Sequence, residues 1–331
     1  MTGSWWRWVR PLGGAAILAA LVVGLGAGPV LDALRATDAG ALAVGAAVAA
    51  ATTACAAWRW RLVARRLGVE LSMPSAVAGC YRAQFLNVTL PGGVLGDVGR
   101  GVSHGRAVDD VGRGLRAVAW ERTCGQVVLI ATTVAVIVVA RPFARPVLVV
   151  PAWVPVAATL LCLGVVLAAR RGGLRLGRRA VRVAAADARA LVAPAASIGI
   201  VVASLAVVTG HVATFVVAAR TVGVRLEVVE LVPVALLVLV VGAVPLNLAG
   251  WGPREGAAAW AFAAAGLGAA QGLAVAVAYG TIVLVATLPG ALLLLVGRSG
   301  RARSSTPSST NRLAHSGTPA AADVLGGGAH G

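Results

Sequence analysis

The amino-acid sequence predicts an all-α polytopic membrane protein of about seven or eight transmembrane helices, with one or two re-entrant helical segments. Of its 331 residues, 59% are hydrophobic and only 12% are charged, and the mean hydropathy is +0.87. A soluble domain has roughly a quarter of its residues charged. Apolar runs of about 20 residues, each long enough to cross a bilayer core, recur along the chain.

The candidate spans follow one another with short polar loops between them. They cover residues 12–30, 39–57, 117–140, 147–169, 194–219 and 273–296, with a further long apolar run at 228–248. Together they predict a membrane domain over 1–297. The segment 298–331 is rich in Ser, Pro, Gly and Ala and lacks apolar periodicity, so we expect a disordered tail there.

The basic residues orient these spans. All 29 are arginine, and they concentrate in loops 58–74, 92–116 and 170–193, the first of which contains Arg59, Arg61, Arg65 and Arg66. The positive-inside rule places these loops, and both termini, on the cytoplasmic side of the cell membrane. The net charge of +17 is accounted for in this way, so we exclude a nucleic-acid partner.

Two segments break the alternation of loops and spans. Residues 75–91 have arginine-rich loops on both sides and contain Arg82, Gln84 and Asn87, which predicts a segment that dips into the membrane and returns. Residues 228–268 are open to two interpretations, a second re-entrant hairpin or full spans, and the short apolar run 257–267 favours the hairpin.

An internal similarity links the two halves and allows them to be pseudo-symmetric. The stretches LPGGVLGDVGR and VPLNLAGWGPREG carry a proline, a glycine and an arginine at matching offsets: Pro91 and Pro245, Gly96 and Gly250, Arg100 and Arg254. An acid lies next to this pattern in each copy, Asp97 and Glu255. Paired Pro/Gly interruptions of this kind point to a binding site between the halves of a transporter.

A broken helix suits an anion, because its N-terminus presents unpaired N–H groups and a positive dipole end. Pro253 fits the first turn of a new helix, and Arg254 then stands at that N-terminus, able to hold a phosphate by two hydrogen bonds. An ordinary interhelical loop, in which Arg254 and Glu255 only join two helices, remains the alternative interpretation.

Three motifs also carry a family resemblance. LPGGVLGDVGR, WERTCGQ (120–126) and PLNLAGWGPREG, followed by TLPG (287–290), resemble the lysylphosphatidylglycerol synthase transmembrane region family over about residues 10–297. Asp97 stands where that family usually has glutamate. The resemblance implies the flippase-like, lipid-handling module of these synthases, and we expect a stand-alone member without the aminoacyltransferase domain.

The resulting hypothesis is a protein that binds, and translocates, a phospholipid or a polyprenyl-linked lipid. The residues assigned to phosphate binding and to the broken backbone are Arg100, Arg254, Asn87 and Asn247. The charge partners, which would fix the arginines or meet a cationic headgroup, are Asp97, Glu121, Arg122 and Glu255. The helix breaks are assigned to Pro91, Gly96, Pro245, Gly250 and Pro253.

Other functions stay open at this point. The chain could be the non-catalytic membrane partner of a separate glycosyl- or aminoacyl-transferase, or a membrane-embedded transferase. GVSHG (101–105) has the nucleophile-elbow pattern around Ser103, but that pattern needs a strand-to-helix turn. We expect no enzyme activity, cofactor or metal. His211, within a span, is expected to hydrogen-bond to a neighbouring helix.

Overall fold

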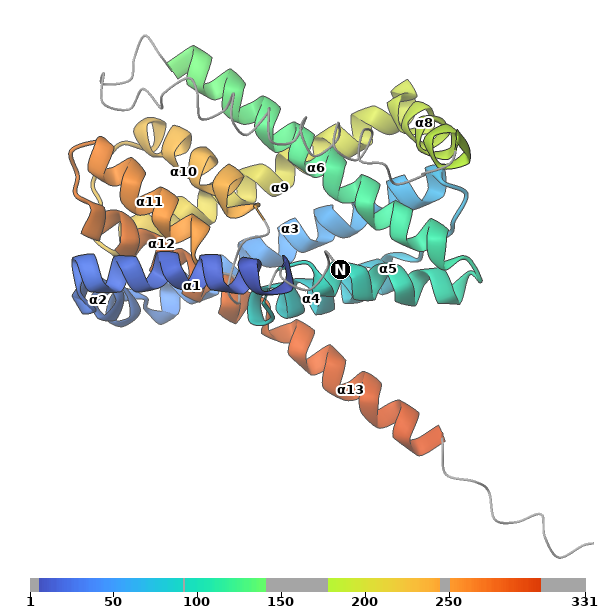
Figure 1. Ribbon diagram of the computed structural model, residues 1–331, viewed down its shortest axis with the longest axis horizontal. Helices are drawn as coiled ribbons and strands as arrows, with labels where there is room; N and C mark the ends of the chain where they lie inside the picture. Colours follow the sequence, from blue (N-terminus) through green and yellow to red (C-terminus); the bar gives the residue numbers. More distant parts are fainter. Residues whose placement is uncertain (1–5, 92, 141–177, 245–250, 305–331) are drawn as a thin grey trace, which may run out of the picture. The chain divides into compact units, whose positions relative to one another are not determined.

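The computed structural model describes residues 6–91, 93–140, 178–244 and 251–304, and the elements in these ranges are α-helices (Figure 1). They are α1 (Trp6–Leu25), α2 (Gly28–Ala36), α3 (Ala39–Arg66), α4 (Met73–Thr89), α5 (Leu95–Ala107), α6 (Val111–Ala140), α8 (Arg178–Val192), α9 (Pro194–Thr221), α10 (Val228–Gly242), α11 (Pro253–Ala264), α12 (Ala269–Ala286) and α13 (Leu288–Ser304).

Four stretches of helix in the described ranges are long and apolar enough to cross a membrane: Ala39–Arg66, Val111–Val139, Ser197–Thr221 and Ala269–Val296. A fifth forms if the bent pair α1–α2 counts as one span. The predicted class, an all-helical polytopic membrane protein, is therefore confirmed. The expected span at 147–169 lies outside the described residues, and α10 is a shorter apolar helix.

The first predicted span, 12–30, is not one straight helix. α1 ends at Leu25, and the chain turns by 98° into α2. Gly26 has a φ of 77°, which glycine adopts without a Cβ penalty, and Pro29 lies in the first turn of α2. The apolar composition continues through this bend, so the length of the run concealed it.

Part of the predicted arginine-rich loops is helical. α3 runs on to Arg66, so Arg59 lies on a helix and is only 5% exposed, contrary to the loop expected at 58–74. α5 occupies most of the expected loop 92–116. α8 begins within 170–193, and its Asp187 pairs with Arg116 of α6 at 3.1 Å. Positive charge predicted loops, but in α3 the buried partners of Arg59, Glu121 and Ser204, allow the helix to continue.

The helices pack through glycine contacts and two main apolar clusters. One cluster is built mainly from α9, α10, α11 and α12, and the other mainly from α3, α4 and α6. Between α11 and α12, a Cβ on Gly272 would stand 2.2 Å from the carbonyl oxygen of Ala258. Between α4 and α5, a Cβ on Gly96 would stand 2.2 Å from the carbonyl oxygen of Ala83. Such close approach of two backbones is typical of membrane helix packing.

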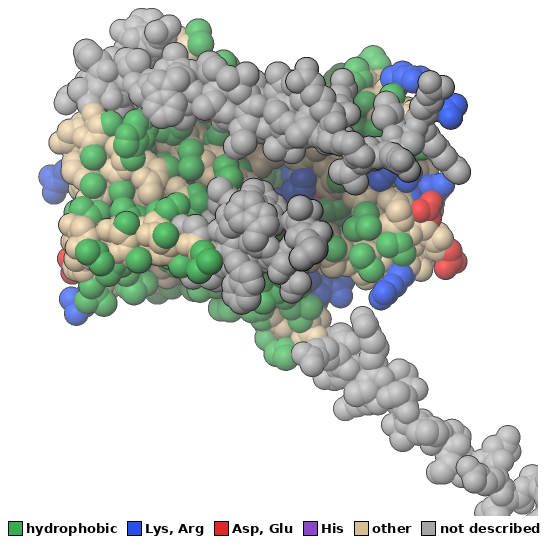
Figure 2. Space-filling view, viewed as in Figure 1, with side chains coloured by type: hydrophobic (Ala, Val, Ile, Leu, Met, Phe, Trp, Pro, Cys, Tyr) green, Lys and Arg blue, Asp and Glu red, His purple; other side chains and the backbone are tan. Residues whose placement is uncertain are grey.

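The outer surface fits an apolar surrounding. Hydrophobic side chains cover much of the described part of the face in Figure 2, and charged side chains lie mostly toward its ends, with some basic ones near the middle. The chain consists of two units, 1–293 and 294–331. In the second unit α13 continues to Ser304, past the predicted start of the tail at 298, and residues 305–331 lie outside the described part.

The approach of α5 to α4 predicts a sharp difference between two glycines of one helix. Gly96→Ala should lower the melting temperature of the purified protein, because its Cβ has no room, and overpacking costs about 1–3 kcal/mol. Gly99→Ala, the matched control, has no atom within 4 Å of its Cβ and should be neutral or slightly stabilising. Equal melting temperatures for the two variants, measured in detergent, would contradict this packing.

The arginine distribution predicts one common side for three exposed positions. Single cysteines at Glu70, Arg106 and Arg189, in a cysteine-free background, should resist an impermeant thiol reagent in intact cells and react after permeabilisation. Labelling of position 106 alone in intact cells would show that α4 crosses the membrane rather than returning.

Candidate functional site

A cavity of about 730 Å³ lies among α3, α4, α5, α6, α9, α11 and α12. Its charged lining residues are Arg59, Arg100, Arg122, Arg254, Asp97 and Glu121, and its neutral polar ones include Gln84, Asn87, Gln126 and His211. A second pocket of about 240 Å³ shares three of these arginines and His211 with it. The arginines predicted from the two halves of the sequence, Arg100 and Arg254, thus line the same cavity.

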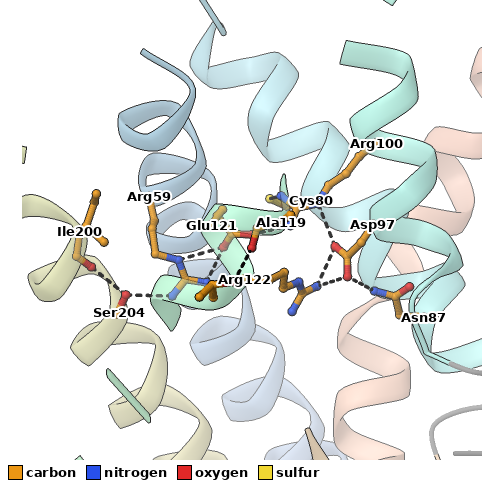
Figure 3. A network of polar contacts seen from close by, with 11 residues as sticks. Arg59, Cys80, Asn87, Asp97, Arg100, Ala119, Glu121, Arg122, Ile200 and Ser204 are labelled. Atoms are coloured by element: carbon orange, nitrogen blue, oxygen red, sulfur yellow. Dashed lines mark hydrogen bonds and ion pairs between the residues drawn. The ribbon is translucent and has the colours of Figure 1, made fainter. Parts of the chain in front are cut away.

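Glu121 lies at the centre of a buried ion network (Figure 3). Its Oε1 accepts hydrogen bonds from Nε of Arg59, at 2.8 Å, and from Nη2 of the same guanidinium. Its Oε2 accepts one from Nη2 of Arg100. Arg59 also donates from Nη1 to Ser204 Oγ on α9, at 3.1 Å. Because Glu121 is 1% exposed, both of its arginine partners compensate a charge that water does not reach.

Asp97 continues the network toward α4 and α6 (Figure 3). Its carboxylate accepts from Nε of Arg100 at 2.9 Å, from Nη2 of Arg122 at 2.8 Å, and from Nδ2 of Asn87 at 2.9 Å. Oδ1 of Asn87 in turn accepts the backbone N–H of Gly96, at 2.8 Å, close to the start of α5. Asn87 therefore bridges the helix break that follows Thr89 and fixes the acid beyond it.

Arg100 is enclosed by the residues around it. Its three nitrogens donate to Asp97, Glu121 and the sulfur of Cys80, and its guanidinium lies over the Trp60 ring, 4.6 Å from the centroid. Burial acts to lower the pKa of Arg100, but the carboxylates of Glu121 and Asp97 outweigh it and raise this pKa. The residue stays charged, and its hydrogen-bonding capacity is largely used within the protein.

Arg122 differs from Arg100 in this respect. Half of its side-chain surface is exposed, and it lines both pockets. Among the described residues only its Nη2 is seen to form a hydrogen bond, to Asp97. Of the arginines in the network, Arg122 therefore presents the largest unoccupied donor surface to the cavity.

Arg254 and Glu255 open α11 at the second interruption. Pro253 is the first residue of the helix, as predicted, after Gly252 with a φ of 125°. Glu255 is fully buried and accepts the Gly252 N–H at 2.6 Å and the Arg254 Nε at 2.9 Å. The Arg254 guanidinium lies over Trp251 and Tyr279, with centroid distances of 5.5 and 5.1 Å.

His211 joins two helices, as the sequence indicated. Its Nδ1 lies 2.9 Å from the hydroxyl of Tyr279, so α9 is hydrogen-bonded to α12. His104 lies on α5, is 7% exposed, and its ring meets the Trp60 ring edge-on. Ser103 lies within α5 rather than at a strand-to-helix turn.

Three predicted site residues lie outside the described part of the chain, and one residue of the site was not predicted from the sequence. Pro245, Asn247 and Gly250 lie outside the described residues. Arg59 was assigned to a loop, although a helical stripe on α3 could have revealed it: Gly45, Ala49, Thr52, Ala56 and Arg59 follow a spacing of three to four, and all line the cavity. Among the described residues, no cluster of three or more His, Cys, Asp or Glu is placed to hold a metal ion.

These features define a class: an all-helical, multi-pass membrane protein with a partly open cavity whose charged lining is mainly arginine. The chain belongs to the family described as the lysylphosphatidylglycerol synthase TM region, whose sequence profile matches residues 7–290. That membership links it to lipid handling. No curated protein shows a significant match to the chain.

The network predicts different costs for two acid-to-amide substitutions. Glu121→Gln weakens a carboxylate shared by two buried arginines, and breaking a buried pair typically costs about 3–5 kcal/mol, so thermal stability and folded yield should fall strongly. Asp110→Asn, the control, breaks an exposed pair with Arg113 and should cost about 0–1 kcal/mol. If both variants melt at the wild-type temperature, Glu121 does not hold the helices together.

Proposed function

We propose that the protein binds a lipid through its phosphate in the arginine-lined cavity and moves the headgroup across the cytoplasmic membrane. The observation that carries this proposal is the meeting of the two interruptions: α5 and α11 bring Arg100, Arg122 and Arg254 to one cavity with the help of α6. Membership of a lipid-handling family supports it.

The electrostatics favour an anionic ligand. A charge removed from water is costly unless it is paired, and Arg122 has donor capacity that its one carboxylate partner does not use. A lipid phosphate offers several acceptor oxygens to a guanidinium, which suits bidentate binding. Arg254, held from behind by Glu255, can supply a second contact to the same phosphate.

The rest of the wall suits the lipid's apolar part. Beside the arginines the cavity is lined by Val94, Val98, Leu115, Val118, Ile282 and Val283. A site that joins a charged end to an apolar wall matches an amphipathic molecule better than a small inorganic anion. Passage of a headgroup along such a site needs no chemical step, so we propose a transport role without enzyme activity or a cofactor.

Substitutions of Arg254 test its contact with the lipid, and Arg254→Lys is the variant that keeps a positive charge beside the buried Glu255. Arg254→Ala should slow the movement of a fluorescent phosphatidylglycerol in proteoliposomes by about ten- to a hundred-fold, because a charge-assisted hydrogen bond contributes about 1.5–3 kcal/mol. Arg254→Lys keeps the charge but loses the planar guanidinium, so its rate should lie between those of the wild type and Arg254→Ala.

The matched control is Arg113→Gln, since Arg113 pairs with Asp110 at the surface and does not line the cavity. Insertion of every variant is compared by the protein content of the vesicles. Wild-type rates for Arg254→Ala and Arg122→Gln would contradict the anion site. No movement even with the wild-type protein would favour the alternative role, a membrane partner of a separate transferase.

A further inference from the structure

The carboxylates around the cavity are all occupied. Glu121 accepts hydrogen bonds from Arg59 and Arg100, Asp97 accepts from Arg100, Arg122 and Asn87, and Glu255 accepts from Arg254 and the Gly252 N–H. Their side chains are 2%, 12% and 0% exposed. A cationic group entering the cavity would have to displace an arginine from one of these buried pairs.

Other acids are not placed to replace them. The sequence contains twelve acidic residues, of which Asp323 alone lies outside the described part of the chain. The remaining eight do not line either pocket: Asp32, Asp38, Glu70, Asp109, Asp110, Asp187, Glu227 and Glu230. In the sequence of the remaining ranges, every charged residue other than Asp323 is an arginine, so the net charge of those ranges is positive.

The balance of charge at the cavity is positive. Four arginines line it, and they face three carboxylates, those of Asp97, Glu121 and Glu255 behind Arg254. One positive charge is therefore not compensated. We assign it to Arg122, because half of the surface of this side chain is exposed. A ligand of one negative charge neutralises this excess, whereas a ligand of one positive charge doubles it.

The geometry points to a lipid that carries one net negative charge and no cationic headgroup, with its phosphate on Arg122 and with Arg100 as a positioning residue behind it. This inference rests on the proposed function and defines its substrate class. On this inference the cavity does not favour lysylphosphatidylglycerol, the lipid in the family's name. A lysyl headgroup carries two amines beside the one phosphate, so that lipid is a net cation.

The test measures the binding of three lipids to the purified full-length protein in detergent by native mass spectrometry. They are phosphatidylglycerol, with one negative charge, phosphatidylcholine, a zwitterion, and lysylphosphatidylglycerol, with one positive charge. We expect phosphatidylglycerol to bind at least tenfold more tightly than either of the others. Arg122→Gln should reduce this preference to less than threefold, and Arg122→Lys should retain a preference over the lysyl lipid because the charge remains.

Arg113→Gln is the matched control on the same helix, with the same loss of charge outside the cavity, and should behave as wild type. Equal or tighter binding of lysylphosphatidylglycerol to the wild-type protein would overturn the inference and leave a lipid-binding function standing. Full preference for phosphatidylglycerol in a folded Arg122→Gln protein would overturn the role of Arg122. Absence of binding by all three lipids would instead defeat the proposed function.

Discussion

The buried carboxylate of Glu121 is the interaction on which the arrangement of the site depends. It lies on α6 and is shared by Arg59 of α3 and Arg100 of α5. Arg59 extends the connection to α9 through Ser204. An ion this deeply buried is tolerated only when its partners are fixed, so one side chain couples the positions of four helices around the cavity.

Glycines make room for these arginines. A Cβ on Gly125 would stand 2.9 Å from Nη1 of Arg59, and a Cβ on Gly280 would stand 2.5 Å from Nη2 of Arg254. Gly96 lets α5 approach α4 closely enough for Asn87 to reach Asp97. The high glycine content therefore serves the charged site as well as helix packing, since a guanidinium needs space beside a backbone.

The two interruptions of the sequence produce different environments for their arginines. At α5, Arg100 is enclosed by two carboxylates, a thiol and an aromatic ring, so the neighbouring network member Arg122 faces the cavity instead. At α11, Arg254 has one carboxylate partner and two aromatic rings. Similar local sequences thus give a structural arginine in one half and a less constrained one in the other.

The sequence by itself determined the membrane class, the helix start at Pro253 and the residues of the two interruptions, because composition and helix chemistry are local properties. It placed Arg59 in a loop and treated Arg122 only as a charge partner. Only the tertiary structure decided that Arg59 is buried, that Arg100 is enclosed and that Arg122 is open. The physical reason is that the partner which compensates a buried charge, and the side of a helix that faces a cavity, come from residues distant in the chain.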